Sequence, residues 1–565
     1  MKALLSLPSP RCLPALRTAA WLGLGALSAP VWAQPVIVPP AAQAGTLQQR
    51  QIDEDRRRRE EERLRPAAPD PLNRPAAPAL APLAPEASAL RFDVREIRFT
   101  PSAILAPADL EAIAAQYRGR HISLAELQAL AAQVNALYQQ QGVVTATATI
   151  GPQDISSGLV EVTLVEGRVG AVDISGHLTT RESYIQSRLG LTAGEIVDLN
   201  QLEERLVWFN RTNDVRLEAD LHPGNSFGHT DILIKAVEPD KHQVLATFDN
   251  LGSPMTGRWR AGMSYRNRSL LGWRDNLSLA YTYARGQKSA SAGYDLPINR
   301  WGGRVDYTYY DDATAVRFGA LSSLNITGRS ESHVLSLRQP VHVSNDLQVD
   351  LTAAAKKRES RNYFDGVQLQ STDSTDGSVG IDVLGSSDKS LWGWSVTRIH
   401  GHATAANNRL PFKLTKGQLR YSRDIAEGWS LRTNAHWQYA GNSSLASSEQ
   451  FLLGGEGSVR GYDIAAYSGD QGATASVELH HAIGMWPLGG KEFATTGFLF
   501  VDHGRLKRAS TQGEGAHLTG LGYGVNASLG KQTSLRLTLA RGIDQLPQNG
   551  RRSVVLSMQL VHSLY

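Results

Sequence analysis

The second half of the chain, from residue 243 to residue 565, alternates between apolar and polar positions in short segments. Along Leu277–Ala284, leucine and tyrosine occupy one face, and serine, alanine and threonine occupy the other. The same period of two recurs in Leu347–Ala353 and in Leu431–Tyr439. Transmembrane barrel strands turn an apolar face to lipid and a polar face to the lumen. The pattern therefore predicts a membrane barrel, although strands of a soluble β-sandwich also alternate.

The length of this region sets the expected number of strands. At about 20 residues for each strand with its turn, it holds about 16 strands, an even number as in bacterial barrels. Beyond the N-terminal region, no segment supplies the roughly 18 consecutive apolar residues of a transmembrane helix.

Residues 90–239 mix strand-like and helix-like periods. The first unit, residues 90–167, has helical spacing in Pro107–Tyr117 and Leu124–Gln141, with Gly142 as a helix cap. A second unit, residues 168–239, repeats the order strand, helix, helix, strand, strand. The other expected elements are strands at Phe92–Phe99, Val143–Ile150, Leu159–Val165, Val215–Leu221 and Asp231–Val237, and helices at Ser183–Leu189 and Leu199–Asn210. The chain thus duplicates a β-α-α-β-β unit of about 75 residues.

The first 33 residues have the features of a secretory signal peptide. A basic region precedes a short apolar core, Thr18–Ser28, and Val31–Ala33 offers small residues for cleavage. The core is too short for a membrane anchor. The only cysteine, Cys12, lies in this segment, so the cleaved chain has no disulfide or thiolate site. Cleavage removes three positive charges, which lowers the net charge from +4 to +1 and weakens any case for nucleic-acid binding.

Residues 44–65 are rich in charge, with glutamate and arginine three or four positions apart in Arg56–Arg63. Such pairs support a solvated helix, and a frayed polar tail is the alternative. Residues 66–88 are rich in proline and alanine and predict an extended linker. At about 3.1 Å per residue the linker reaches roughly 70 Å, so the helix can lie far from the domain that follows.

Two short segments of the barrel region carry charges that a closed barrel would bring together. Phe451–Tyr462 is rich in glycine and has one arginine, Arg460, at its tip. Farther along, Phe500–Gly504 places one carboxylate, Asp502, in an apolar strand-like run. A guanidinium meets a carboxylate through two parallel hydrogen bonds. We expect this pair to hold a long loop inside the lumen; an exposed arginine on a surface loop is the alternative.

The sequence offers no constellation typical of an enzyme or a cofactor site. Gly224–Gly228 matches the G-x-S-x-G motif of hydrolases, but it joins two short strands, so a turn is expected. The 15 histidines show no metal-ligand spacing, and His480 and His481 should point to opposite faces of a strand. No phosphate-binding glycine loop is present. We predict no catalytic site, no cofactor and no metal.

Several motifs resemble those of the two-partner secretion transporter (TpsB) family, typified by the filamentous-haemagglutinin transporter. Val459–Tyr462 matches the family's signature at the tip of its sixth extracellular loop, and Gly469–Gly472 follows at the family's spacing. Phe500–Gly504 matches the F-x-D-x-G strand motif. Asp249–Gly252 resembles the opening of the family's first barrel strand, and Leu270–Asp275 resembles the segment after it. In the duplicated units, Tyr138–Gly142 and Gly158–Gly167 resemble the helix end and closing strand of a POTRA domain.

The resemblance implies a mainly β fold: a 16-stranded antiparallel transmembrane β-barrel, two periplasmic β-α-α-β-β POTRA domains and an N-terminal plug helix. The implied domains are a signal peptide (1–33), the plug helix (44–65), a linker (66–88), POTRA domains (90–167 and 168–239) and the barrel (243–565), with a lumen-inserted loop around 445–475. It also implies structural gate residues without a catalytic role: Arg460, Asp502, Val459, Gly461, Tyr462, Phe500, Gly504, Asp470 and Gly472.

The function implied by the resemblance is export of an exoprotein across the outer membrane of a Gram-negative bacterium, without ATP. The POTRA domains would recognise the extended exoprotein in the periplasm, and Val215–Leu221 with Asp231–Val237 is the expected binding edge. Implied partners are a haemagglutinin-, haemolysin- or adhesin-like exoprotein with an N-terminal secretion domain, outer-membrane lipid, and the barrel-assembly machinery during biogenesis. The alternatives are a barrel-assembly insertase of the same superfamily, then a passive porin or adhesin barrel, and last an outer-membrane hydrolase.

Overall fold

The computed structural model describes residues 38–64, 66, 70–73, 91–141, 143, 145–226, 228–405, 408–441, 443–507, 515–546 and 554–565. The expected signal peptide, the Gly142 cap and most of the linker lie outside these residues. Within the described part, the chain is mainly β. None of the helices in that part is long and apolar enough to cross a membrane.

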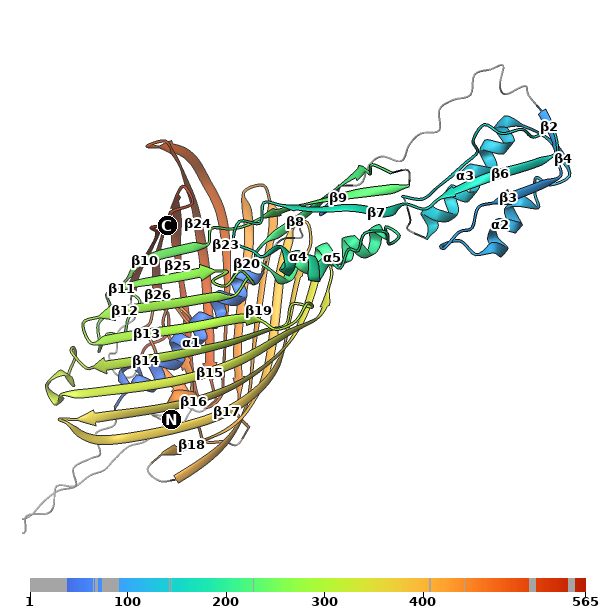
Figure 1. The fold of residues 1–565 in the computed structure, drawn as a ribbon. Helices are drawn as coiled ribbons and strands as arrows, with labels where there is room; N and C mark the ends of the chain where they lie inside the picture. Colours follow the sequence, from blue (N-terminus) through green and yellow to red (C-terminus); the bar gives the residue numbers. More distant parts are fainter. Residues whose placement is uncertain are drawn as a thin grey trace, which may run out of the picture. The chain divides into compact units, whose positions relative to one another are not determined.

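Sixteen strands of the described residues form one closed barrel, in which each strand is antiparallel to its neighbours (Figure 1). This confirms the fold that the alternation predicts and the strand number that the length of the region predicts. The strands are β10 (His242–Asp249), β11 (Arg260–Arg268), β12 (Asn276–Ala284), β13 (Gln287–Pro297), β14 (Arg304–Ala315), β15 (Ile326–Val343), β16 (Leu347–Phe364), β17 (Val367–Ser386), β18 (Ser390–Ala405), β19 (Asn408–Ala426), β20 (Trp429–Tyr439), β23 (Gly472–Leu488), β24 (Lys491–Leu506), β25 (Ala516–Leu529), β26 (Thr533–Gly542) and β27 (Val554–Ser563).

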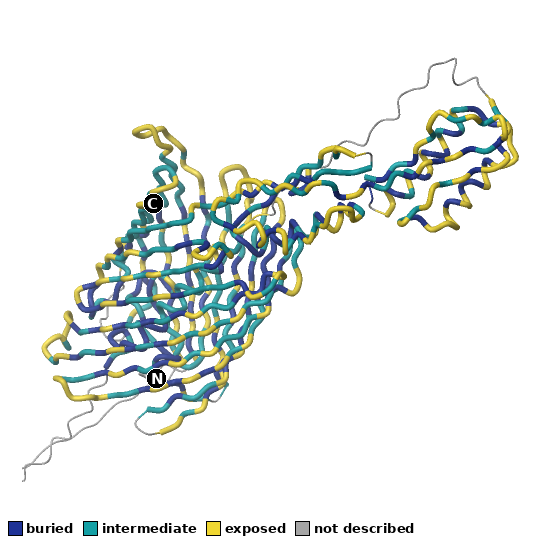
Figure 2. The backbone as a smooth tube through the Cα atoms, viewed as in Figure 1, coloured by how far each residue is buried: buried dark blue, intermediate teal, exposed yellow. Residues whose placement is uncertain are grey.

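The two faces of the barrel wall follow the alternation. On β12, Tyr281 and Tyr283 are 47% and 48% exposed on the outer surface. Ala280 and Thr282, on the other face of this strand, line a cavity in the lumen. Figure 2 shows buried and exposed residues alternating along the strands in the same way. The outer face is therefore the one available to lipid.

The motif comparison predicts that Asp249–Gly252 opens the first barrel strand, and this prediction is wrong. β10 begins at His242, and Asp249 is its last residue. The side chain of Asn250 accepts a hydrogen bond from the Met558 backbone at 2.8 Å and donates one to the Leu556 carbonyl at 2.7 Å, both in β27. The motif therefore holds the ends of the first and last strands together, where β10 pairs with β27 to close the barrel.

The first α/β unit has two small sheets covered by two helices. Its elements are β2 (Arg91–Val94), β3 (Glu96–Phe99), α2 (Pro107–Ala114), β4 (Arg120–Ser123), α3 (Leu124–Gln140), β5 (Thr147–Thr149) and β6 (Leu159–Val165). The strand order is β3-β6-β5, and β2 pairs with β4. A capping box between Ser123 and Glu126 begins α3. The strand expected at Val143–Ile150 is shorter, because its ladder with β6 covers only Thr147–Thr149.

The second unit has the expected order of elements and one strand more. It comprises β7 (Arg168–Ser175), α4 (Glu182–Leu189), α5 (Leu199–Thr212), β8 (Arg216–Pro223) and β9 (His229–Val237). Gly224–Gly228 joins β8 to β9, as expected of a turn. The strand order is β1-β8-β9-β7, and β1 (Leu72–Asn73) belongs to the linker. The linker thus adds a strand to this sheet.

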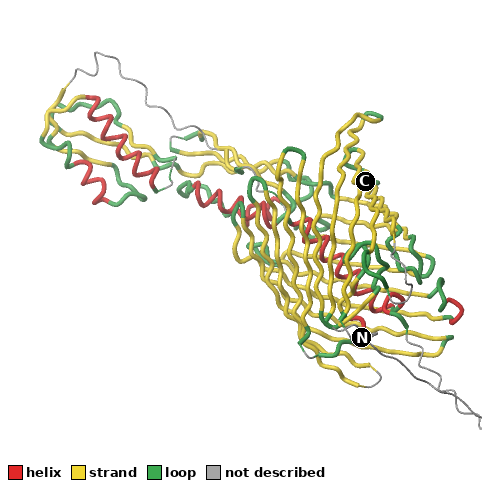
Figure 3. The backbone as a smooth tube through the Cα atoms, turned by 180° about the vertical axis from the view of Figure 1, so that it is seen from behind, coloured by secondary structure: helices red, strands yellow, loops and turns green. Residues whose placement is uncertain are grey.

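A charged helix, α1 (Ala44–Arg63), lies within the barrel after a short turn, η1 (Pro40–Ala42) (Figure 3). The segment between β20 and β23, here called the lumen loop (residues 440–471), lies beside α1. The loop contains η4 (Ser447–Glu449) and a hairpin of β21 (Phe451–Leu453) and β22 (Tyr467–Gly469). A further turn, η3 (Ser322–Leu324), joins β14 to β15.

Candidate gate in the barrel lumen

The tip of the lumen loop is fixed to the barrel wall by Arg460 and Asp502. Arg460 Nε donates to Asp502 Oδ2 at 2.7 Å, and Nη2 donates to Oδ1 at 2.7 Å. The backbone N–H of Arg460 also donates to Oδ2, at 3.0 Å. Both side chains are buried, with 4% and 1% of their surface exposed. The contact is a two-bond fork, a geometry that fixes position as well as charge.

A second carboxylate, which the sequence comparison missed, completes the arginine site. Arg460 Nη1 donates to Glu478 Oε1 of β23 at 2.5 Å, and Nη2 donates to Ser476 Oγ at 2.9 Å. The guanidinium carbon lies 3.5 Å from the centre of the Phe500 ring, in a cation–π contact. Arg536 also donates to Glu478, at 3.1 Å. Glu478 and Ser476 lie two positions apart on β23 and so share one face of the strand. The alternation along β23 would have placed both side chains in the lumen.

Gly461 and Gly504 let the loop approach the wall closely. Gly461 has a φ of +91°, a backbone conformation that glycine adopts without strain. A Cβ at Gly504 would lie 2.3 Å from Leu453 Cδ1 and 2.9 Å from Val459 Cγ2, and Val459 is fully buried. Any larger residue at position 504 would therefore push the loop away from β24.

Tyr462 fixes the same tip to the extracellular ends of other strands. Its hydroxyl donates to the Thr519 carbonyl at 2.9 Å and accepts from the Asp544 backbone N–H at 2.8 Å. At the stem of the loop, Asp470 Oδ1 accepts from Leu445 N at 3.3 Å and from Gln450 Nε2 at 3.2 Å. The tip is thus anchored to the wall, and Asp470 ties the two sides of the loop stem to each other.

Gly472 begins β23, where the stem joins the wall. A Cβ there would lie 2.6 Å from Leu506 Cδ2 and 2.6 Å from Phe451 Cδ1. All nine residues expected at the gate therefore lie on the lumen loop or on the strands that it contacts. The sequence comparison did not include the residues that hold α1.

Gln48 anchors the N-terminal half of α1 to the barrel wall. Its amide nitrogen donates to Asp312 Oδ2 at 2.9 Å and to the Ser330 carbonyl at 2.7 Å. Its amide oxygen accepts from the hydroxyl groups of Ser330 and Ser332 at 2.8 and 2.5 Å. Gln48 is fully buried. Both ends of one amide are therefore satisfied by β14 and β15.

The next residue, Gln49, joins the helix to the stem of the lumen loop through two wall cations. Gln49 Oε1 accepts from Arg358 and from Lys356 Nζ, both on β16. The same cations bind Glu449 of η4, at 2.9 Å from Arg358 Nη1 and 3.2 Å from Lys356 Nζ. Arg358 and Glu449 are each 1% exposed. Helix, wall and loop stem thus share one buried network.

The C-terminal half of α1 is held by ion pairs with several sectors of the wall. The pairs are Arg59 with Asp306 at 2.9 Å, Arg63 with Asp350 and with Asp382, Glu62 with Arg266 at 2.9 Å, and Glu61 with Arg420 at 3.0 Å. Most of these side chains remain partly exposed to the lumen. Partly exposed pairs contribute little net stability, because water offers both charges comparable contacts.

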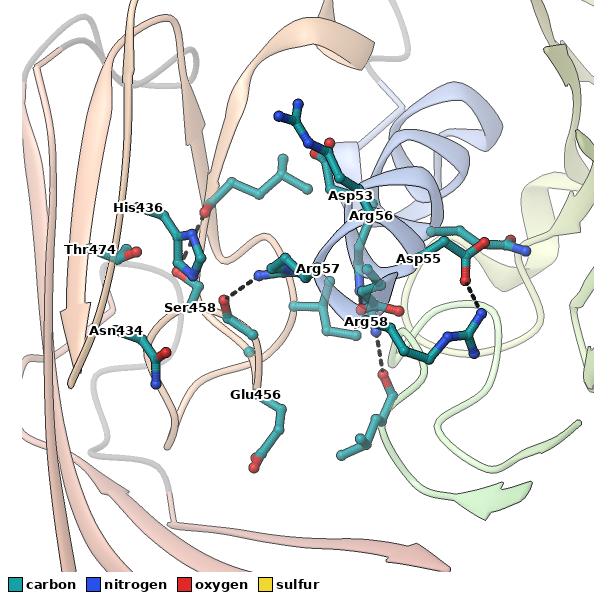
Figure 4. Close-up of a pocket in the computed structure, with 18 of the residues that line it drawn as sticks. Asp53, Asp55, Arg56, Arg57, Arg58, Asn434, His436, Glu456, Ser458 and Thr474 are labelled. Atoms are coloured by element: carbon teal, nitrogen blue, oxygen red, sulfur yellow. Dashed lines mark hydrogen bonds and ion pairs between the residues drawn. The ribbon is translucent and has the colours of Figure 1, made fainter. Parts of the chain in front are cut away.

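A cavity of about 1220 Å³ remains beside α1 and the lumen loop. Figure 4 shows Arg57 of α1 pointing toward the loop segment that carries Ser458, with His436 and Asn434 on the opposite wall. Arg57 Nη1 donates to the Gly457 carbonyl at 3.2 Å. Both α1 and the loop border this cavity, so each narrows the path through the barrel. Among the described residues, no group of three or more histidine, cysteine or acidic side chains is arranged to hold a metal.

The second α/β unit is fixed to the barrel at the turn that follows β11. Arg274, whose side chain is 1% exposed, donates to both carboxylate oxygens of Asp214, at 2.9 and 2.5 Å. Although burial favours the neutral acid, Arg274 holds the pKa of Asp214 below its ordinary value. Partial burial would likewise raise the pKa of Glu238, but hydrogen bonds from Thr179 and Thr180 lower it.

Asp214 makes the joint sensitive to acid, because its partner Arg274 belongs to the barrel. A carboxylate whose pKa is lowered in the docked state stabilises docking above its ordinary pKa, and this contribution is lost as the pH falls through the lowered value. We expect the joint to be rigid at pH 7 and to loosen below about pH 4. Asp214→Asn should give the loose state already at pH 7, measured by spin-label distances between α4 and β12. Asp173→Asn, an exposed change on β7, is the control, and identical distance distributions in D214N and the control would contradict the assignment.

The sheet edge expected to bind an exoprotein is occupied by the linker. Leu72 lies opposite Ala219 and Asn73 lies opposite Asp220, in a parallel pairing with β8. The Ala219 N–H donates to the Pro71 carbonyl at 2.8 Å. Leu72 is 3% exposed and packs in the core of this unit. β8 is therefore an inner strand in this structure, and an incoming strand would have to displace β1.

Comparisons with known proteins agree with this architecture. Residues 228–527 match the family described as Haemolysin secretion/activation protein ShlB/FhaC/HecB, and residues 92–167 match the ShlB-type POTRA domain. The outer membrane transporter CdiB of Dickeya dadantii (strain 3937) is 26% identical over 436 residues, 74% of this chain and 76% of the relative. The heme/hemopexin transporter protein HuxB of Haemophilus influenzae (strain Rd) is 24% identical over 466 residues, 75% of this chain and 80% of the relative.

Solved structures share the fold. CdiB from Escherichia coli superposes with a TM-score of 0.66 at 20% identity, over 92% of this chain and 98% of that structure. BamA from Haemophilus ducreyi, lacking POTRA domains 1–3, superposes with a TM-score of 0.51 at 12% identity, over 84% of this chain and all of that structure. At these identities the likeness concerns the fold alone.

Proposed function

We propose a route of export for this chain, which belongs to the Haemolysin secretion/activation protein family ShlB/FhaC/HecB and is an outer-membrane transporter of two-partner secretion. On this route, the exoprotein crosses the barrel while α1 is out of the lumen. The POTRA domains lie in the periplasm. The observation that carries the proposal is the nature of the contacts of α1. Hydrogen bonds and ion pairs dominate them, and water in an open lumen can replace both. α1 is therefore suited to leave and return.

Recognition of the exoprotein is proposed at β8. An extended segment that pairs with β8 gains backbone hydrogen bonds with little demand on its sequence. It would compete with β1, because both need the same edge of β8. Since the linker continues from α1, loss of β1 from the sheet frees the chain that restrains the helix. Binding in the periplasm would in this way favour an open lumen.

Leu72→Asp should strengthen exoprotein binding, because it drives β1 out of the core of the second unit. If β1 covers the edge about nine-tenths of the time, its removal raises the apparent affinity about tenfold. The measurement is the Kd of the detergent-solubilised protein for the secretion domain of its exoprotein, by fluorescence anisotropy. Asn73→Ser, an exposed change on β1 that keeps a donor for Asp220 and leaves the buried leucine in place, is the control. Equal affinity of L72D and wild type would mean that the exoprotein uses another edge.

Arg460 and Asp502 are proposed as a latch that keeps the lumen loop in its closed position, with Glu478 as a second acceptor. Val459, Gly461, Tyr462, Phe500 and Gly504 shape the contact between loop and wall, and Asp470 and Gly472 fix the stem. We assign these residues a structural role and no catalytic one. The exoprotein is proposed to be a haemagglutinin-, haemolysin- or adhesin-like protein. Its folding at the cell surface is proposed to make export proceed outward without ATP.

The proposed function is tested by deleting the gene and measuring release of the exoprotein at the cell surface, together with the amounts of other outer-membrane barrels. Loss of release with normal barrel levels, restored by the wild-type gene, supports a transporter. Normal release with a general loss of barrels would instead identify an insertase. That alternative rests on the shared fold, whereas the matched family is one of secretion proteins.

A further inference from the structure

A second, smaller pocket lies on the barrel, outside the lumen. Its volume is about 300 Å³, and it is lined by Lys389, Tyr421, Arg423, Asp424, Ile425 and Leu431. Lys389 belongs to the turn between β17 and β18, and the other residues lie on β19 and β20. The backbone N–H of Asp424 donates to the Lys389 carbonyl at 2.8 Å, which joins the two sides of the pocket.

The alternation places this pocket on the outer face of the barrel. Arg423 has the same parity on β19 as Leu419, which is 44% exposed. Arg420, of the opposite parity, lines the lumen cavity and pairs with α1. The pocket therefore faces the lipid side of the wall.

Strand direction places the pocket at the periplasmic end. The turn after β11 contacts the second α/β unit, because Arg274 binds Asp214. In an antiparallel barrel the turns after β13, β15, β17 and β19 lie at the same end. Lys389 follows β17, and Arg423 lies near the end of β19. The pocket is thus at the level of the periplasmic leaflet.

The positive charges of the pocket are not fully offset by acids within the described residues. The side chains of Lys389 and Arg423 have no hydrogen bond or ion pair there, in contrast to Arg266 and Arg420 on the lumen side. Asp424 is the one acid of the lining, so the pocket carries one excess positive charge. Cations at a membrane surface are strongly stabilised by an anionic headgroup.

The remaining lining and the volume fit the same ligand. Ile425 is 52% exposed, and with Leu431 it offers apolar surface beside the cations. Tyr421 adds an aromatic ring at the level where such rings meet lipid headgroups. At about 30 Å³ for each water, the pocket holds roughly ten waters, which is room for a phosphate and a glycerol group.

We propose that this pocket binds the headgroup of a glycerophospholipid from the periplasmic leaflet. The phosphate diester lies between Lys389 and Arg423, and an acyl chain follows Ile425 along the outer wall. The bound lipid would hold the β17–β20 sector of the rim at a fixed depth in the membrane. This inference concerns the outer wall and does not depend on the proposed path of the exoprotein.

The test is native mass spectrometry of the full-length protein in mild detergent, with phosphatidylglycerol, phosphatidylethanolamine or lipopolysaccharide added in separate samples. Wild type should retain one phospholipid, and Lys389→Ala/Arg423→Ala should retain about tenfold less. Lys531→Ala/Arg505→Ala removes two exposed cations elsewhere and should match wild type. Lys389→Arg/Arg423→Lys should restore retention, and heat modifiability on gels confirms that each barrel is folded. Equal retention by the two alanine pairs, or retention of lipopolysaccharide alone, would overturn the proposal.

Discussion

Replacement of Arg460 by alanine should leave a barrel that assembles normally but loses most of its secretion. The change removes the cation that Asp502 and Glu478 share, and both carboxylates are almost fully buried. Loss of one partner from a buried ion pair costs about 3–5 kcal/mol, because the remaining charge stays unpaired. The pairing between β23 and β24 needs neither side chain, so the wall remains intact. The loop tip should leave its position, which we expect to reduce secretion about tenfold or more and to alter channel conductance.

Two controls separate the latch from a general defect. Arg505→Ala removes an exposed arginine from the outer face of β24 and should secrete normally. Arg460→Lys keeps the charge but loses the two-bond fork, so it should fall between wild type and R460A. In a double-mutant cycle, R460A combined with Asp502→Ala should be little worse than R460A alone. Full secretion by R460A would remove the basis for a latch.

Removal of residues 39–64 should open the lumen. These residues include all of α1, which borders the cavity and contacts β14, β15, β16 and the lumen loop. Water can enter the vacated space and hydrate Asp312, Arg358 and Asp350, so the barrel should remain folded. We expect a large increase in single-channel conductance in planar bilayers and increased entry of large antibiotics into cells.

A pair of point variants tests the same anchoring within the full chain. Gln48→Ala removes the hydrogen bonds to β14 and β15, each of which contributes about 1 kcal/mol. The fraction of molecules with α1 out of the lumen should therefore rise about tenfold or more. Arg58→Ala is the control, since Arg58 pairs with Asp55 of the same helix at 2.8 Å and with no other acid in the described part of the chain. Similar opening in Q48A and R58A would show that the Gln48 contacts do not hold α1.

The sequence predicts the barrel well because alternation of apolar and polar side chains is a local property. Leu277–Ala284 and Leu431–Tyr439 both form strands with the expected faces. The Arg460–Asp502 contact follows from two motifs and a closed wall. Glu478 could have been added from its face on β23, but its distance of 18 residues from Arg460 in sequence gives no direct sign of the contact.

The contacts of α1 and of the linker could not be predicted in this way. Gln48 meets Asp312 across 264 positions of sequence, and Leu72 meets Ala219 in another domain of the chain. A helix that is polar on all sides has no apolar stripe that indicates its neighbours, and a two-residue strand is too short to show a period. The motif Asp249–Gly252 lies at the end of the first barrel strand and not at its start, because a short motif does not show which end of a strand it occupies.

If α1 must leave the lumen for secretion, a reversible cross-link between α1 and the barrel wall should block export. A Cβ built at Gly45 lies 3.1 Å from Ser360 Cβ on β16, close to the roughly 3.5–4.5 Å of a disulfide. The only native cysteine is Cys12, in the expected signal peptide, so a Gly45→Cys/Ser360→Cys variant contains one designed pair. Secretion is measured with the pair oxidised and then reduced, with each single variant as a control. We expect no secretion when the pair is oxidised and recovery on reduction; full secretion with α1 cross-linked would show that the helix need not leave the lumen.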